Sequence, residues 1–215
     1  MREEILNGEL ASGSLHSIYG LSAKYNVSRT PVRDASLRLA DAGLLKIERN
    51  RGVRIRGLGV SDIREVFELR ILLEVPAAAR AAARAAPAFA DELASRLAAL
   101  AVAAERSDGT EFSRLDRELH RAILCSTGNG RMVDIVESLR DVIQTHGAST
   151  VSMSRTAREV LEEHEPIVAA IRAGDIDAAA KWMGAHLSRT GLLLMRQASV
   201  ITGEPLPVVW PPSVP

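Results

Sequence analysis

Residues 27–39, VSRTPVRDASLRL, have the pattern of a short amphipathic helix that begins with polar and basic side chains. Ser28 is expected to be its N-cap, because a hydroxyl at that position can accept a hydrogen bond from an amide one turn ahead. Pro31 is tolerated in the first turn, where the amides have no helical partner. Apolar residues recur at helical spacing and predict the face that packs inward: Val32, Ala35 and Leu39.

The other side chains at the start of this helix are suited to DNA. Arg29, Thr30 and Arg33 lie at its N-terminal end and outside the apolar stripe. Guanidinium, hydroxyl and amide groups in this arrangement can bind phosphate oxygens and the base edges of a major groove. An ordinary amphipathic surface helix has the same pattern, so the flanking sequence must distinguish the two.

The flanking residues complete a winged helix-turn-helix. Two short helices precede the quoted segment, and a glycine after Ala42 predicts its end. Two short strands follow, joined by a turn that contains Arg49, Arg51 and Gly52. The expected elements before the quoted segment are a helix at residues 1–10 and a helix with a turn at 21–26. After it we expect a glycine stop at 42–43, a strand at 44–47, a turn at 49–52 and a second strand at 53–56.

Charge and composition support a DNA-binding N-terminal half. The 215-residue chain has no net charge, but residues 1–57 contain 10 Lys and Arg against 6 Asp and Glu, and the remainder contains 17 against 21. The basic half therefore holds the helix-turn-helix, as electrostatic attraction to DNA requires. Cys125 is the single cysteine, which excludes an intramolecular disulfide and fits a reducing cytoplasm. No apolar run approaches membrane-spanning length and no signal peptide is visible, so we expect a cytoplasmic protein without a membrane partner.

From residue 62 to about 199 the hydrophobic periodicity is helical throughout. Ser61 or Asp62 is expected to cap the first of these helices, and Gly174-Asp175 predicts a stop followed by a restart. Pro76 and Pro166 are expected to kink or split the helices that contain them. The predicted helices are 62–85, 88–106, 109–126, 129–150, 155–173 and 175–199.

The sequence thus predicts a mainly α protein, with an N-terminal winged helix-turn-helix that carries a small β-hairpin wing and a C-terminal all-α antiparallel helical bundle. A proline-rich tail cannot be helical and is expected to be disordered or draped on the surface. The predicted divisions are the DNA-binding domain, a linker, the bundle and the tail: residues 1–57, 58–61, 62–200 and 201–215.

Three histidines and one carboxylate form a candidate metal site in the predicted bundle. Asp116 and His120 are four residues apart, so both project from one face of a helix. His164 and His186 lie on the last two predicted helices, each followed by apolar residues that would hold its helix in the bundle. One carboxylate and three imidazoles suit zinc, nickel or manganese and leave positions open for water or an anion. Spacing alone is weak support, because a helical histidine is more often a hydrogen-bonded core or surface residue.

Two longer segments resemble a known family. Residues 27–55, VSRTPVRDASLRLADAGLLKIERNRGVRI, are similar to the DNA-binding domain of the GntR family of bacterial transcription regulators, over roughly residues 5–55. DRELH (116–120) and EHEPIVAAIRAGDIDAAAKWMGAHL (163–187) resemble the FCD effector domain of its FadR subfamily. The resemblance implies that the protein binds a palindromic operator in double-stranded DNA as a homodimer. It also implies that the affinity of the homodimer for this operator responds to a small organic acid.

The resemblance also implies roles for individual residues. The metal ligands would be Asp116, His120, His164 and His186. Arg70, in ELRILLE, matches an arginine often found near the effector cavity, but a salt bridge to Glu74 one turn away is an equal alternative. The side chains and backbone expected at the DNA are Ser28, Arg29, Thr30, Arg33, Arg49, Arg51 and Gly52.

The chain departs from the family pattern at a few positions. Ser36 occupies a position that usually holds a core leucine, and Ile18 and Tyr19 replace a Glu and a polar or basic neighbour. Leu119 replaces a common Phe. These changes bear on the operator sequence and on the identity of the effector.

The alternative function is a metal-dependent enzyme acting on a small carboxylate, since a partly open His/Asp site can activate water, but no partnered general base is evident beside these motifs. A winged helix used only for protein interaction is a third reading, and the complete ligand set speaks against it.

Overall fold

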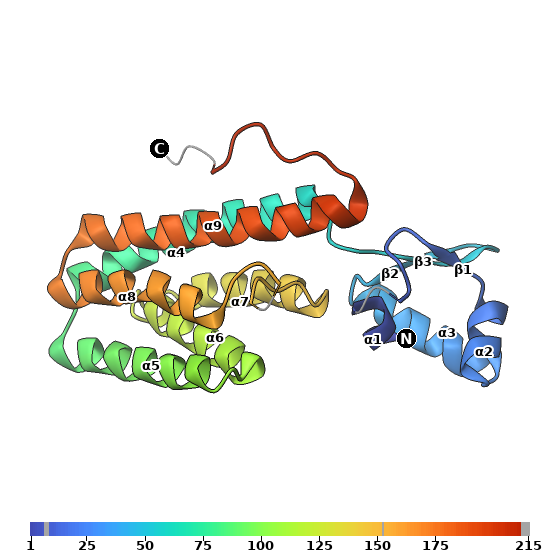
Figure 1. The fold of residues 1–215 in the computed structure, drawn as a ribbon, viewed down its shortest axis with the longest axis horizontal. Helices are drawn as coiled ribbons and strands as arrows, with labels where there is room; N and C mark the ends of the chain where they lie inside the picture. The colour runs from blue at the N-terminus through green and yellow to red at the C-terminus, as the bar shows by residue number, and fades with distance from the viewer. Residues whose placement is uncertain (7–8, 152, 212–215) are drawn as a thin grey trace.

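The computed structural model describes residues 1–6, 9–151 and 153–211. Figure 1 shows a small N-terminal part with a sheet beside a larger bundle of long helices, as the sequence predicted. The N-terminal elements are α1 (Arg2–Leu6), β1 (Leu15–His16), α2 (Ile18–Tyr25), α3 (Arg29–Asp41), β2 (Leu45–Glu48) and β3 (Gly52–Ile55). The bundle contains α4 (Val60–Ala83), α5 (Pro87–Glu105), α6 (Gly109–Cys125), α7 (Gly130–Thr145), α8 (Ala157–Ala173) and α9 (Ile176–Thr202).

The helix-turn-helix is formed by α2 and α3. Asn26 ends α2 in the left-handed region, with φ of 52°, and Gly43 has φ of 77° after α3, which is the glycine stop expected there. Ser28 occupies the N-cap of α3, but its hydroxyl accepts no hydrogen bond from the helix, so the expected capping interaction is wrong. Val32 and Leu39 are buried as predicted.

The wing is a three-stranded antiparallel sheet in the order β1-β3-β2. In the hairpin Ile47 lies opposite Val53, and on the other side His16 also lies opposite Val53. The sequence did not predict β1, because two residues are too few to show an alternating pattern. The first helix ends at Leu6 rather than at Leu10, since residues 9–10 form a bend; residues 7–8 of that prediction lie outside the described part.

The bundle helices agree closely with the predicted ranges, with three corrections. Helix α4 begins at Val60 with Gly59 as N-cap, and Asp62 contributes from inside the first turn by accepting from the Gly59 amide at 2.9 Å. Helix α7 ends at Thr145, five residues early, and a loop leads to Thr156, which caps α8. Pro76 and Pro166 lie inside continuous helices and do not split them. Each proline removes one backbone hydrogen bond, and packing of α4 and α8 against α9 outweighs that loss.

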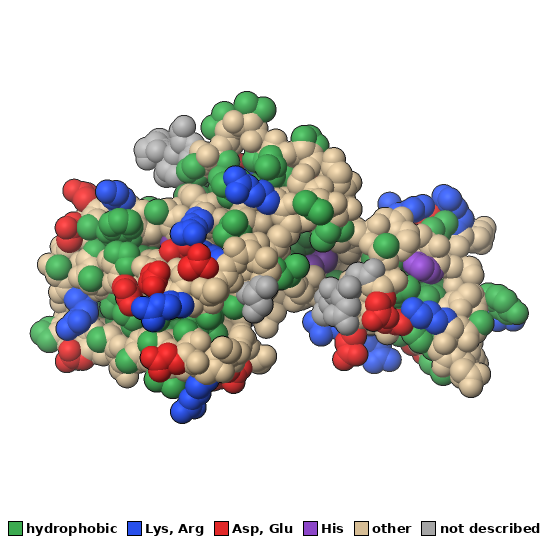
Figure 2. All heavy atoms as spheres, in the orientation of Figure 1, with side chains coloured by type: hydrophobic (Ala, Val, Ile, Leu, Met, Phe, Trp, Pro, Cys, Tyr) green, Lys and Arg blue, Asp and Glu red, His purple; other side chains and the backbone are tan. Residues whose placement is uncertain are grey.

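The described part of the tail after α9, residues 203–211, is draped over the bundle, one of the two outcomes expected for it, and residues 212–215 lie outside the described part. It returns along α9 (Figure 1), and apolar side chains cover the surface there (Figure 2). Glu204 accepts from the Val60 amide at 2.7 Å, and the Trp210 indole donates to the Ser188 carbonyl at 2.8 Å. In the described part of the chain, no helix is both long and apolar enough to cross a membrane.

Candidate metal centre and DNA-binding surface

Four side chains from three helices meet inside the bundle. Asp116 and His120 come from α6, His164 from α8 and His186 from α9. One potential ligand atom from each lies within 4.8 Å of the others, and the three histidines are buried. The spacing on α6 places its two residues on one face, while Ile167 and Leu187, both fully buried, anchor α8 and α9 in the core beside them. The bundle therefore brings together the residues that the sequence singled out.

Each histidine uses its Nδ1 atom for a hydrogen bond that points away from the cluster. His164 Nδ1 donates to the Val160 carbonyl at 2.7 Å. His120 Nδ1 donates to Glu74 Oε2 at 2.5 Å, and His186 Nδ1 donates to Glu163 Oε2 at 2.8 Å. Carbonyl and carboxylate oxygens only accept, so the proton resides on Nδ1 and leaves Nε2 as the ligand atom. This is the orientation that metal-binding histidines require.

The Nε2 atoms and Asp116 approach one another closely. His120 Nε2 lies 3.1 Å from His164 Nε2, and Asp116 Oδ1 lies 3.2 Å from His164 Nε2. Two nitrogen lone pairs at this distance repel each other unless a proton or a cation lies between them. Two nitrogens bound about 2.1 Å from one ion are separated by about 3.0–3.4 Å, depending on the coordination geometry. The donor set and its spacing therefore fit a divalent metal ion.

Guanidinium groups balance the buried carboxylates around the cluster. Arg70 Nε lies 2.7 Å from Glu74 Oε1, and Arg155 Nη1 lies 2.6 Å from Glu163 Oε2. Arg140 is paired with the second oxygen of Asp116. Arg189, which is largely exposed, also pairs with Glu163 at 3.2 Å. The other charged groups are three acids and three arginines, whose charges balance before any ion binds: Glu74, Asp116, Glu163, Arg70, Arg140 and Arg155.

Burial and these ion pairs shift the acid–base equilibria of the cluster. Burial alone would raise the pKa of Asp116, but Arg140 and the neighbouring histidines hold it well below its usual value. Burial and the adjacent His164 together lower the pKa of His186 to about 3, although the hydrogen bond to Glu163 opposes the shift. Burial also lowers the pKa of His120, although Glu74 opposes the shift. Asp116 is thus ionised, whereas His120 and His186 are neutral at pH 7, the forms in which both residue types bind metals.

Arg70 forms the salt bridge that was one of its two alternatives, and Glu74 links it to His120. Sequence reasoning did not find the supporting roles of Glu163, Arg140 and Arg155. Glu163 directly precedes His164 in the EHEP segment, and this adjacency was the available signal. Arg140 and Arg155 lie on other segments, and no spacing pattern connects them to the cluster.

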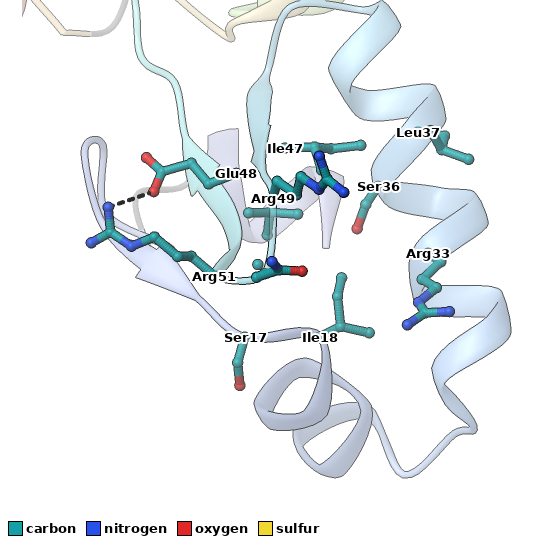
Figure 3. Close-up of a pocket in the computed structure, with 12 residues that line it drawn as sticks. Ser17, Ile18, Arg33, Ser36, Leu37, Ile47, Glu48, Arg49 and Arg51 are labelled. Atoms are coloured by element: carbon teal, nitrogen blue, oxygen red, sulfur yellow. Dashed lines mark ion pairs between the residues drawn. The ribbon is translucent and has the colours of Figure 1, made fainter.

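Three basic residues from α3 and the wing line one groove: Arg33, Arg49 and Arg51. A groove of about 470 Å³ lies between α3 and the hairpin, and Arg33 and Arg49 reach it from opposite sides (Figure 3). Ser28, Arg29 and Thr30 are exposed at the start of α3. Arg51 is held by Glu48 at 3.1 Å, and Glu48 also accepts from Arg54 at 2.5 Å.

Gly52 has a structural role in the wing. Its φ is 122°, and a Cβ at this position would lie 2.1 Å from the His16 carbonyl oxygen of β1. Only glycine fits this close approach of two strands. Ser36, the other unusual position, is buried and donates to the Val32 carbonyl at 2.7 Å.

Comparisons with known proteins agree with this architecture. The model of the gntR family of bacterial regulatory proteins matches residues 1–55, and the FCD domain model matches residues 65–189. The transcriptional repressor RspR of Escherichia coli K12 is 27% identical over 187 residues, covering 87% of this chain and 82% of that protein. A probable D-xylose utilization operon transcriptional repressor of Paenarthrobacter nicotinovorans is 30% identical over 185 residues, which cover 86% of this chain and 81% of that protein. The solved structure of the Listeria monocytogenes protein Lar shows the same fold, with a TM-score of 0.68 at 19% identity. The match covers 91% of this chain and 93% of the Lar chain.

The FCD match alone spans more than half of the chain, and the xylose-operon relative is aligned over most of both proteins. The helix-turn-helix and the wing lie within the residues that the gntR model matches, and α5 to α8 lie wholly within those that the FCD model matches. The chain therefore belongs to the GntR family of DNA-binding bacterial transcription regulators and carries an FCD domain.

Proposed function

We propose that a divalent metal ion in the FCD domain, together with a small organic acid bound beside it, controls how tightly this regulator binds its operator. The observation that carries the proposal is the convergence of three buried Nε2 atoms, each oriented by a hydrogen bond at Nδ1. Without a cation, the lone pairs of the three Nε2 atoms would repel one another in a buried site, and this would destabilise the folded protein.

Asp116, His120, His164 and His186 would hold the ion, which is zinc, nickel or manganese by the chemistry of the donors. When bound, the metal supplies positive charge that can attract a carboxylate. Neutral imidazoles and a single carboxylate leave the loaded site with a net positive charge, because the surrounding acids are already paired with arginines. Arg70, fixed by Glu74, would contribute to effector binding from the side of His120.

We further propose that the protein acts as a homodimer on a palindromic operator in double-stranded DNA. Contacts are assigned to the start of α3 and the wing turn, that is to Ser28, Arg29, Thr30, Arg33, Arg49, Arg51 and Gly52. One winged helix covers one half-site, so two-fold symmetry in the DNA needs two chains. Exposed apolar side chains on α4 and α7 offer a surface for the second chain: Leu69, Leu72, Ile135 and Val142.

We propose a functional division of the chain in which α4 already begins within the linker, at Val60, and α9 extends two residues into the tail, to Thr202. Residues 1–57 would bind DNA, residues 58–61 would link the domains, and residues 62–200 would bind the effector, followed by the tail 201–215. The relatives named above are called repressors, which favours repression as the action of this protein on its target genes.

The double variant His164→Ala, His186→Ala tests the metal's role. We expect it to lose bound metal and effector response while retaining basal operator affinity, because neither residue is in the DNA-binding part. Metal content, thermal shift with and without chelator, and operator affinity across a panel of organic acids are the measurements. His146→Ala is the matched control, since this histidine caps the end of α7 and donates to the Val142 carbonyl at 2.8 Å, outside the cluster.

A full effector response from metal-free double variant would refute the regulatory role of the metal. Loss of operator binding in the same variant would show that the metal is a structural brace instead. Metal-dependent turnover of a carboxylate by the wild-type protein would favour the enzymatic alternative.

A further inference from the structure

Leu37 is an exposed apolar side chain of α3 that lines the groove between this helix and the wing. It is 53% exposed and points outward from the helix (Figure 3). It follows Arg33 by four residues and Thr30 by seven, so the three side chains share one face of the helix. The buried residues Val32 and Leu39 lie on the other face and pack into the domain core. Helical geometry therefore places Leu37 next to the residues assigned to DNA contact.

The surroundings of Leu37 favour a nucleic acid over an apolar protein partner. Leu37 and Ile47, which is 45% exposed, line the same groove as Arg33 and Arg49. Glu48 is a carboxylate of this groove, and it pairs with Arg51 and Arg54. Among the described residues, neither Arg33 nor Arg49 forms an ion pair with it. Unneutralised guanidinium groups beside an exposed leucine are complementary to a polyanion that also presents an apolar group.

In the major groove of DNA that apolar group is the C5 methyl of thymine. We propose that Leu37 contacts one thymine methyl in each half-site of the operator and makes the protein selective for thymine there. The inference rests on the proposed docking of α3 in the major groove, and it adds a hydrophobic base contact to the polar contacts of the arginines. Arg33, one turn earlier, then faces a base pair next to that thymine.

The expected effect follows from the size of one methyl group. Burying a methyl-sized group contributes about 0.8 kcal/mol, which is about a fourfold change in affinity. Replacing the contacted thymine by deoxyuracil removes the methyl and keeps the base pair. One substituted half-site should weaken binding about fourfold, and both together about fifteenfold.

The test begins with selection of a binding site from random duplex DNA by the full-length protein. Each thymine of the selected half-site is then replaced singly by deoxyuracil, and the dissociation constant is measured for wild type, Leu37→Gln and Leu15→Gln. Leu15 is the matched control, because it is 36% exposed in β1 of the same domain and outside the groove. Melting temperatures verify that both variants fold.

We expect one thymine at which methyl removal weakens the wild type and Leu15→Gln about fourfold, with no effect on Leu37→Gln. The inference is overturned if no single methyl matters, or if its removal weakens Leu37→Gln equally, while the selected site is still bound. If the folded protein selects no sequence at all, the proposed function fails, and the inference fails with it.

Discussion

Replacing Glu163 by Gln would show whether the carboxylates behind the histidines tune metal affinity. Glu163 accepts from His186 Nδ1 at 2.8 Å and pairs with Arg155 at 2.6 Å. Gln has the same shape and can still accept one hydrogen bond, but it has no charge. The change therefore weakens the support of His186 without removing any of the four proposed ligands.

The size of the effect can be estimated from the loss of charge. A hydrogen bond to an ionised partner contributes about 1.5–3 kcal/mol and a neutral one about 0.5–1.5 kcal/mol, so the substitution costs roughly 1–1.5 kcal/mol. Metal affinity should fall about tenfold, the lower end of the range for residues that orient metal ligands. At a fixed, saturating metal concentration, a tenfold loss removes about 1.4 kcal/mol of stabilisation. The rise in melting temperature on adding metal should then shrink by about 3–5 °C for a chain of this length.

Metal affinity is measured by competition with a chromophoric chelator, and melting temperature by circular dichroism with and without metal. Glu162→Gln is the matched control, because Glu162 is the neighbouring residue on α8 and its one ion pair among the described residues is a surface pair with Arg158 at 3.1 Å. The reasoning is refuted if Glu163→Gln binds metal as tightly as wild type, or if both variants lose affinity equally.

Three further outcomes are expected. Arg33→Ala should weaken operator binding by roughly 1–3 kcal/mol and relax sequence preference at one base pair; wild-type affinity and salt dependence in a gel shift would contradict the docking of α3. Gly52→Ala should destabilise the N-terminal domain by more than about 2 kcal/mol in denaturant titrations. The alanine Cβ would collide with the His16 carbonyl oxygen, and the φ of 122° is strained for any residue with a side chain. Wild-type stability of this variant would contradict the packing of β3 on β1. In metal-free protein, the free energy of unfolding should fall as pH decreases from about 6.5 toward 3. The reason is that histidines of the unfolded chain gain protons in this range, whereas buried His120 and His186 do not. Urea titrations at successive pH values measure this free energy, and a constant value would contradict the prediction.

The helices were predictable wherever local chemistry determines them. Gly43 and Gly174 have positive φ and end helices where the sequence placed these ends, and Asp175 caps α9 by accepting from the Ala178 amide at 2.9 Å. Two of the errors, at the start of α4 and at Pro76, arose where a distant partner decides. The tail residue Glu204 accepts from the Val60 amide at the start of α4, and packing along α9 keeps α4 continuous through Pro76. No window of local sequence contains these contacts.

The candidate metal site divides in the same way. Asp116 and His120 could be paired from their spacing on one helix, but spacing gave only weak support to the meeting of three helices, and the family resemblance strengthened it. Glu74 was visible as the partner of Arg70 at helical spacing, whereas its second oxygen accepts from His120 on another helix, 46 residues away. Each carboxylate oxygen can accept separately, so one buried acid orients a ligand while neutralising a buried arginine. Glu163 has the same double use on His186 and Arg155, whereas Asp116 is itself a proposed ligand and pairs with Arg140. The bundle thereby buries three carboxylates around the proposed cation site at little net charge.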